Sequence, residues 1–184
     1  MTTRIQAPLA DAVEDPMVPM IVKAMREGWW ADGALAQVLS YRPESLKTTV
    51  SLVETLYTKS GLDPVLLELM RITVAETRDD SYGSNIRVQP FKEAVAAKRD
   101  GGLTERESVA VRVAERMVRN PHTVDDALFA QLTEHFSDTE VIAVIFAVSV
   151  FSMASLIAIA LHLDTEADGP YGAGLIYRQE HLKS

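Results

Sequence analysis

The chain has 184 residues, 47% of them hydrophobic and 24% charged, which suits one soluble domain with a buried core. Its formal net charge of −8 argues against a nucleic-acid partner, because contacts with phosphates need a basic surface. The absence of cysteine excludes disulfides, thiolate metal sites and cysteine nucleophiles.

Residues 1–42 are expected to form an N-terminal arm with short helices. The first sixteen residues lack the apolar core of a signal peptide, which predicts a cytoplasmic protein. Apolar residues from Met17 to Arg26 recur at helical spacing, and Gly28 ends that stretch. Trp29 and Trp30 are adjacent and point in different directions, so at least one should pack against the core or a partner subunit. The alternative is that Trp29 forms a wall of a substrate pocket.

Residues 43–165 are expected to form an all-α core, because apolar residues recur at helical spacing and no stretch alternates as a strand would. Asp63 followed by Pro64 is a strong helix start, and Thr104 and Ser137 each open a capping box. The helix expected at residues 84–99 has an irregular start or begins only at residue 89, because Pro90 falls within its first turns. The expected helices are 17–26, 33–40, 43–59, one from 64 to the polar residues that begin at 78, 84–99, 104–119, 123–135 and one from 137 to about 163.

The segment Val141–Leu163 contains no charged residue and is long enough to cross a bilayer. Its capping box, the acidic residues close to both ends and the lack of a nearby Lys or Arg favour a central helix of a soluble protein. Ser149, Ser152 and Ser155 recur at helical spacing, which also suits close packing in an interior. We therefore expect no membrane partner.

The most informative stretch is the apolar run from 65 to 75, which carries a single carboxylate, Glu68, and ends in a polar turn at 78–84. A helix that is apolar nearly all round is buried, so Glu68 is predicted to be a buried acid. One interpretation is a general acid or base whose pKa is raised by its apolar surroundings. The other is an ion pair with Arg71, one turn further on, or with Arg87.

This stretch resembles the carboxymuconolactone decarboxylase and AhpD-like family, in which a helical Glu is followed after twelve residues by a C-x-Y/H-C or C-x-Y-E turn and then by a His. With Glu68 and Tyr82 in register, Asp80 stands at the first Cys, Gly83 at the second Cys or Glu, and Arg87 at the His. The resemblance extends from about residue 41 to about residue 164. It implies an AhpD-like helical bundle that forms homo-oligomers, either trimers or dimer-based hexamers, with a pocket between helices near a subunit interface.

The resemblance also suggests a set of site residues, although most of the family's motif positions are replaced. Glu68 would move a proton, Arg87 would hold a developing negative charge, and Tyr82 with Asp80 would complete the polar end of the pocket. The alternatives are that Asp80 caps the next helix, that Tyr82 is half-buried with its hydroxyl in water, and that Arg87 pairs with Asp80 or Glu68. The candidates are Glu68, Asp80 and Tyr82 as catalytic residues and Arg87, Arg71 and Trp29 as substrate-binding residues.

The function expected from these residues is a cofactor-free, non-redox enzyme acting on a small anionic organic substrate by decarboxylation, isomerisation or cyclisation. One alternative is an inactive binding or structural relative, and a less favoured one is residual AhpD-type peroxidase activity, which lacks its thiols here. No two histidines have metal-ligand spacing, so no metal is expected, and only His162 should be buried. Residues 166–184 are expected to be a tail that is either disordered or strapped onto a neighbouring subunit.

Overall fold

The computed structural model describes residues 3–8, 13–167 and 169–171, and this part of the chain forms helices and no strands, which confirms the all-α prediction. Two short 3₁₀ turns interrupt the succession of α-helices. The elements are α1 Met17–Glu27, α2 Ala34–Leu39, α3 Pro43–Lys59, α4 Pro64–Thr77, α5 Ser81–Asn85, η2 Gln89–Phe91, α6 Lys92–Gly101, α7 Glu105–Arg119, η3 Pro121–Thr123, α8 Asp126–His135 and α9 Asp138–Leu161.

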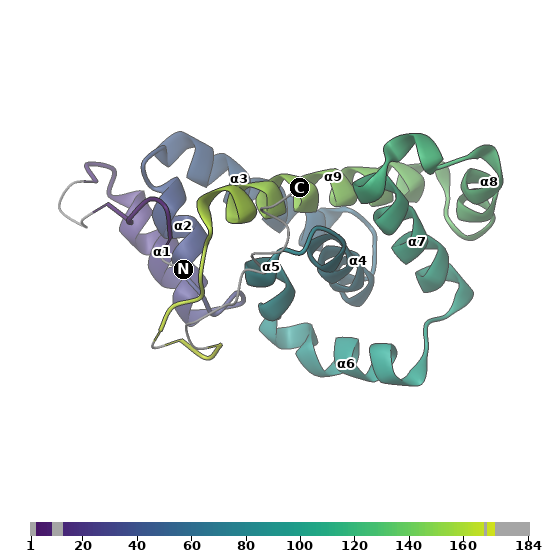
Figure 1. The fold of residues 1–184 in the computed structure, drawn as a ribbon, viewed down its shortest axis with the longest axis horizontal. Helices are drawn as coiled ribbons and strands as arrows, with labels where there is room; N and C mark the ends of the chain where they lie inside the picture. Colours follow the sequence, from purple (N-terminus) through teal and green to yellow (C-terminus); the bar gives the residue numbers. More distant parts are fainter. Residues whose placement is uncertain (1–2, 9–12, 168, 172–184) are drawn as a thin grey trace, which may run out of the picture.

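Helix α4 lies at the centre of the molecule, and α9 runs along the long axis of the molecule (Figure 1). Asp63 accepts a hydrogen bond from the Val65 amide and Pro64 is the first helical residue, so α4 begins where its local signals predict. Nine of its 14 residues are buried, because α5, α7 and α9 all pack against it. The largest cluster of buried apolar side chains joins α4 to α7, α8, α9 and the end of α3. The central helix is therefore fixed on nearly every side.

One expected helix is wrong: residues 84–99 do not form a continuous helix. The chain makes the short helix α5, continues through the extended residues Ile86 and Val88, and turns into η2 before α6 begins at Lys92. Pro90 explains the break, because it has no N–H to donate and excludes the α conformation from the residue before it. A smaller error concerns α8, whose N-cap is Asp125, accepting from the Leu128 amide, and not Thr123.

Helix α9 is long and apolar enough to cross a membrane by length and composition alone, with a mean hydropathy of 2.6 in its most apolar stretch. Its capping box at Ser137 is present as predicted. Of the three serines expected in the interior, Ser155 is buried and Ser149 is exposed. The helix ends at His162, which takes a left-handed conformation and is partly exposed, so the prediction that it is buried is wrong. Arg4 covers this end by donating to the Ala160 and Leu161 carbonyls.

The first residues of the C-terminal tail pack on their own chain. The Glu166 carboxylate accepts from Arg26 at 3.0 Å, from the Gly33 amide at 3.1 Å and from Gln37 at 2.6 Å. The Tyr171 hydroxyl accepts from Gln89 at 2.6 Å. Residues 172–184, on which the prediction of a disordered or strapped tail mainly rests, lie outside the described residues, and the division of the chain after residues 42 and 165 stays a prediction.

Candidate active site

A cavity of about 470 Å³ lies between α1, α2, α3, α4, α5 and α9. Most of its wall is apolar, and Trp29 contributes to that wall while its ring also packs edge-on against Tyr57 at a centroid distance of 4.7 Å. Both interpretations of Trp29, as anchor and as pocket wall, therefore hold in this geometry. Four polar side chains line the cavity where α4, α5 and α9 meet: Arg71, Asp80, Tyr82 and Ser155. The other polar lining residues, Thr49, Glu54 and Thr58, lie on α3.

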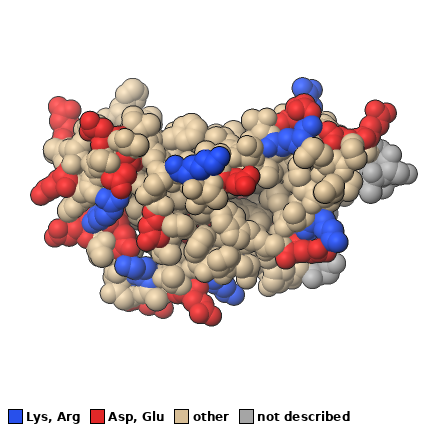
Figure 2. All heavy atoms as spheres, turned by 180° about the vertical axis from the view of Figure 1, so that it is seen from behind, with Lys and Arg blue, Asp and Glu red and all other residues tan. Residues whose placement is uncertain are grey.

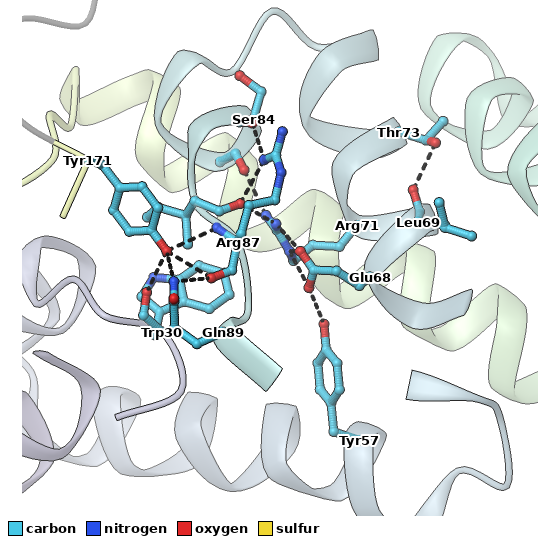
Figure 3. Close-up of polar contacts among 12 residues, drawn as sticks. Trp30, Tyr57, Glu68, Leu69, Arg71, Thr73, Ser84, Arg87, Gln89 and Tyr171 are labelled. Carbon is cyan, nitrogen blue, oxygen red and sulfur yellow. Dashed lines mark hydrogen bonds and ion pairs between the residues drawn. The ribbon is translucent and has the colours of Figure 1, made fainter. Parts of the chain in front are cut away.

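Glu68 is fully buried and closely paired with Arg71 (Figure 3). The Arg71 Nε atom lies 2.9 Å from one carboxylate oxygen and 3.1 Å from the other, and its Nη2 also donates to Oε1. The Tyr57 hydroxyl donates to Oε2 at 3.0 Å. Glu68 does not itself line the cavity, whereas its two partners Tyr57 and Arg71 do. Glu68 therefore forms the expected ion pair with Arg71.

Arg71 connects α4 to the chain that follows it. Besides its bonds to Glu68, it donates to the Gly83 carbonyl from Nη1 and to the Ile86 carbonyl from Nη2, each at 2.7 Å. Its guanidinium also lies 5.0 Å from the centre of the Trp30 ring. Burial lowers the pKa of Arg71, but the neighbouring Glu68 more than offsets this and leaves the pKa above its ordinary value. The cation is retained, and four of its five N–H groups are occupied.

Asp80 has two roles in the geometry. It is the N-cap of α5, accepting from the Gly83 amide at 3.0 Å, as the capping alternative predicted. Its carboxyl is also 2% exposed and lines the cavity. Burial raises the pKa of Asp80, although the Gly83 amide, Ser155 and Arg71 oppose the shift. A carboxyl in such a site can be tuned toward the range in which proton transfer is efficient.

Ser155 is the second polar group at this end of the cavity. Its side chain is 4% exposed, and its hydroxyl oxygen has no hydrogen-bond partner of good geometry. Leaving a buried hydroxyl unpaired costs free energy, so such a group in a cavity wall is a candidate contact for a bound molecule.

Gly83 explains how the carboxylate of Asp80 fits. A Cβ atom on Gly83 would lie 2.4 Å from Asp80 Oδ2 and 3.1 Å from the Ala75 Cβ, and the first of these distances is shorter than any allowed contact. The two residues that stand at the family's cysteine positions therefore depend on each other. The carboxylate of Asp80 occupies the space that a side chain at position 83 would need.

Tyr82 is 1% exposed, so the prediction of a half-buried ring with its hydroxyl in water is wrong. Its hydroxyl donates to Asp32 Oδ1 at 2.8 Å and accepts from the Leu35 amide at 3.3 Å and from Trp30 Nε1 at 3.4 Å. Asp32 is fully buried, which raises its pKa, and it also accepts from the Ala34 and Glu166 amides. The sequence reasoning missed Asp32, whose only local signal is its position two residues before a helix.

Arg87 lies beside this region but outside the cavity lining. Its guanidinium donates to the carbonyls of Ser84 and Ile86, and neither Asp80 nor Glu68 is its hydrogen-bond partner (Figure 3). The Tyr171 hydroxyl donates to its carbonyl at 2.8 Å. Burial and the neighbouring Arg71 lower the pKa of Arg87. A role for Arg87 in holding a substrate stays a prediction.

Within the described part of the chain, no group of three or more His, Asp and Glu side chains is placed so that it could hold a metal ion. Tyr57, Trp30 and Ser155 join Asp32 as residues of the region that were not predicted from the sequence. These residues belong to other elements than α4 and α5, so only the packing of α3, α9 and the 28–33 turn against α4 and α5 reveals their place in the site.

Solved structures resemble this protein over nearly its whole length, whereas no protein-family model and no curated protein sequence matches it. An uncharacterised peroxidase-related protein from Silicibacter sp. has 19% identity and a TM-score of 0.72, covering 95% of this chain and 96% of its own. A peroxidase-related protein with an alkylhydroperoxidase AhpD core, from Ralstonia eutropha, has 16% identity and a TM-score of 0.71 over 89% and 92%. The debrominase Bmp8, in a complex with 2,3,4-tribromopyrrole, has 12% identity and a TM-score of 0.72 over 91% and 94%. The chain therefore has the all-α fold of the AhpD-like, peroxidase-related proteins.

Proposed function

We propose that this protein is a cofactor-free, non-redox enzyme that transfers a proton on a small organic molecule bound in the cavity, and that Asp80 carries the proton. The observation behind the proposal is a buried carboxyl with a raised pKa that lines a mostly apolar cavity beside Arg71 and Ser155. Perturbed carboxyls in cavities are typical of proton-transfer sites. The chain has no cysteine, so a thiol-based reaction has no nucleophile.

The proposed reaction uses the groups at the polar end of the cavity. The Asp80 carboxylate would take a proton from a carbon next to a carbonyl, and the C–H electron pair would move into the carbonyl to form an enolate. The remaining N–H of Arg71 and the Ser155 hydroxyl would stabilise the enolate oxygen. Return of the proton to another carbon would complete an isomerisation, and attack of the enolate carbon on an electrophilic carbon within the molecule would close a ring. In a decarboxylation the enolate would form by cleavage of the bond to the departing carbon dioxide, and Asp80, protonated at the start, would then donate its proton to the enolate carbon.

Glu68 is better placed to position these groups than to move the proton itself. Its Oε1 accepts from Arg71 and its Oε2 accepts from Arg71 and Tyr57, and Glu68 does not line the cavity. We propose that it holds Arg71 in the charged state and in place. Tyr82 would have a similar structural task, because Asp32 accepts its hydroxyl hydrogen.

The walls of the cavity define the kind of substrate. They include Trp29, Val50, Tyr57 and Phe151, which fit an apolar ring or short chain. Arg71, the cation in the cavity lining, can bind one anionic or carbonyl group of the substrate at the polar end. The debrominase of the same fold binds 2,3,4-tribromopyrrole, a compact and largely apolar ring, which is in keeping with such a substrate. We place this activity in the cytoplasm.

A second candidate is a binding protein without turnover. It is favoured by the replacement of the cysteine and histidine positions of the family motif by Asp80, Gly83 and Arg87. An AhpD-type peroxidase reaction is a weaker candidate, because the thiol pair is missing.

The test begins with native mass spectrometry of the purified protein, to identify a small molecule that copurifies. Exchange of its carbon-bound hydrogen with deuterated water is then followed by NMR. We expect Asp80→Asn to slow this exchange by roughly 100-fold or more while the affinity changes by only a few fold. Asp79→Asn is the matched control, because Asp79 is exposed and left-handed, a conformation that Asn tolerates.

The outcomes separate the two candidates. A bound molecule that does not exchange in the unaltered protein would favour the binding protein. Exchange that proceeds equally fast in Asp80→Asn would remove Asp80 from the mechanism.

A further inference from the structure

The side of α9 that faces solvent is a continuous apolar stripe. Four large side chains on it are exposed: Ile142 by 66%, Phe146 by 48%, Met153 by 37% and Leu156 by 52%. Two small exposed residues complete the stripe, which consists of Ile142, Phe146, Ser149, Met153, Leu156 and Ala160. We call these six residues the α9 stripe. An exposed apolar patch of this kind marks an interaction surface.

The spacing of the α9 stripe indicates another helix as its partner. Successive positions are four, three, four, three and four residues apart, which is the alternation of a coiled-coil seam. The stripe is roughly 27 Å long at 1.5 Å per residue. A single face with this period fits against one straight helix.

We propose that the α9 stripe pairs with the α9 stripe of a second copy of this chain, with the two helices antiparallel about a two-fold axis near residue 151. In this register Ile142 lies opposite Ala160 of the second copy, Phe146 opposite Leu156, and Ser149 opposite Met153. Every pair joins a larger side chain to a smaller one. The stripe residues alternate between the two core positions of a heptad, a and d, and in this register each a position lies opposite a d position of the second copy. The surface is thus complementary to itself, as a two-fold interface requires.

Charges at the two ends of α9 favour the antiparallel direction. Acidic side chains gather at the end of the molecule formed by α7 and α8, where α9 begins with the exposed Asp138 (Figure 2). Glu140 at the same end is paired with Arg106. At the other end Arg4 covers the last carbonyls of α9, with Asp164 a short distance beyond. Antiparallel pairing brings Asp138 of one copy toward Arg4 of the other and aligns the helix dipoles favourably, whereas parallel pairing opposes like charges.

The pairing would also complete the cavity. Met153 belongs to the α9 stripe and lines the cavity as well, so Ser149 of the second copy would cover it at the cavity rim. The inference stands on the stripe and does not depend on the proposed reaction.

Disulfide trapping tests both the contact and its direction, because the full-length chain has no cysteine of its own. Ile142→Cys and Ala160→Cys are made as separate variants, co-expressed and mildly oxidised. Antiparallel pairing predicts a mixed disulfide dimer and no crosslink in either variant alone, since two copies of residue 142 would be about 27 Å apart and a disulfide needs Cα atoms within roughly 7 Å. Crosslinking of each variant with itself would show parallel pairing and overturn the proposal.

The assembly is measured in parallel by native mass spectrometry and by flotation with neutral and anionic lipid vesicles. We expect an even number of subunits, and Phe146→Glu should weaken the association by at least about 100-fold. Phe129→Glu is the control, because Phe129 is 43% exposed on α8, away from the stripe. A monomer in the unaltered protein, or flotation with vesicles that Phe146→Glu abolishes, would overturn the proposal, the latter in favour of a membrane surface.

Discussion

Two buried carboxylates at the junction of α4 and α5 differ in how fully they are bonded. Glu68 is closed off: Arg71 and Tyr57 bond to its two oxygens, and no part of it reaches the cavity. Asp80 lies twelve residues further on, lines the cavity and stands beside the Ser155 hydroxyl, which has no hydrogen bond of good geometry. Burial alone therefore does not distinguish a structural acid from a chemical one. The distinguishing feature is that groups beside Asp80, the Ser155 hydroxyl and one N–H of Arg71, can still form hydrogen bonds with a bound molecule.

The largest effect expected from this comparison is on stability. Glu68→Gln leaves the Arg71 guanidinium buried without a counter-charge, which should lower the free energy of unfolding by about 3–5 kcal/mol. Urea denaturation measures it. Glu76→Gln on the same helix is the control: its partner Arg99 and Glu76 itself are about two-fifths exposed, so the loss should be below about 1 kcal/mol.

A compensating variant sharpens this test. Adding Arg71→Met to Glu68→Gln removes the unpaired charge and should restore part of the lost stability, because Met cannot donate to the Gly83 and Ile86 carbonyls. If Glu68→Gln costs no more than Glu76→Gln, the description of Glu68 as the closed, structural member of the two carboxylates is wrong.

The pH dependence of stability should reveal the raised pKa of Asp80. Because burial raises this pKa in the folded state above the ordinary value of 3.8, the folded state holds the proton more tightly than the unfolded state. The associated stability is fully present below pH 3.8 and is lost as the pH rises through the folded-state pKa, by about 1.4 kcal/mol for each unit of the shift. Asp80→Asn should abolish this part of the decline.

Urea denaturation from pH 3 to 8 would measure that difference. Asp32, whose pKa is also raised by burial, contributes with the same sign in both proteins and cancels when the curves are subtracted. Asp79→Asn, at the exposed neighbouring position, is the control for the loss of one carboxylate. A difference curve for Asp80→Asn that is flat with pH would show that Asp80 titrates as an ordinary exposed acid.

Local signals were enough to predict most helices. The caps at Asp63, Thr104 and Ser137 lie where the sequence placed them, because a cap depends on residues only two or three positions away. The helix expected at 84–99 failed at Pro90, where the sequence left two starts open. The chain turns into η2 at Gln89, the second of these positions, and α6 begins only at Lys92.

The site was less predictable, because its contacts join distant parts of the chain. The pairing of Glu68 with Arg71 is visible in the sequence as a spacing of three residues. The burial of Tyr82 was missed because its acceptor, Asp32, is 50 residues away. Ser155 belongs to the site only because α9 passes over α5, and no local pattern separates it from Ser149 on the exposed side of the same helix.

Gly83→Ala tests whether the position of Asp80 depends on the space left by the glycine. The new Cβ would meet Asp80 Oδ2 at 2.4 Å and push the carboxylate from its capping position, which should cost about 1 kcal/mol of stability and reduce proton exchange more than that loss explains. Gly101→Ala is the control, because nothing lies within 4 Å of its added Cβ. If Gly83→Ala exchanges protons as fast as the unaltered protein, the function of Asp80 does not depend on the glycine at position 83.

Ser155→Ala should have the smallest effect on stability, and its sign is informative. The buried hydroxyl has no hydrogen bond of good geometry but lies close enough to Asp80 to lower the pKa of that carboxyl, so its removal should change the free energy of unfolding by less than about 1 kcal/mol. If the hydroxyl contacts the bound molecule, the same variant should weaken binding by roughly tenfold, as loss of one hydrogen bond does. Isothermal titration of the copurified molecule and urea denaturation measure the two quantities on one protein. If Ser155→Ala loses stability but keeps its affinity for the bound molecule, Ser155 has a structural role, as Glu68 does, and does not contact that molecule.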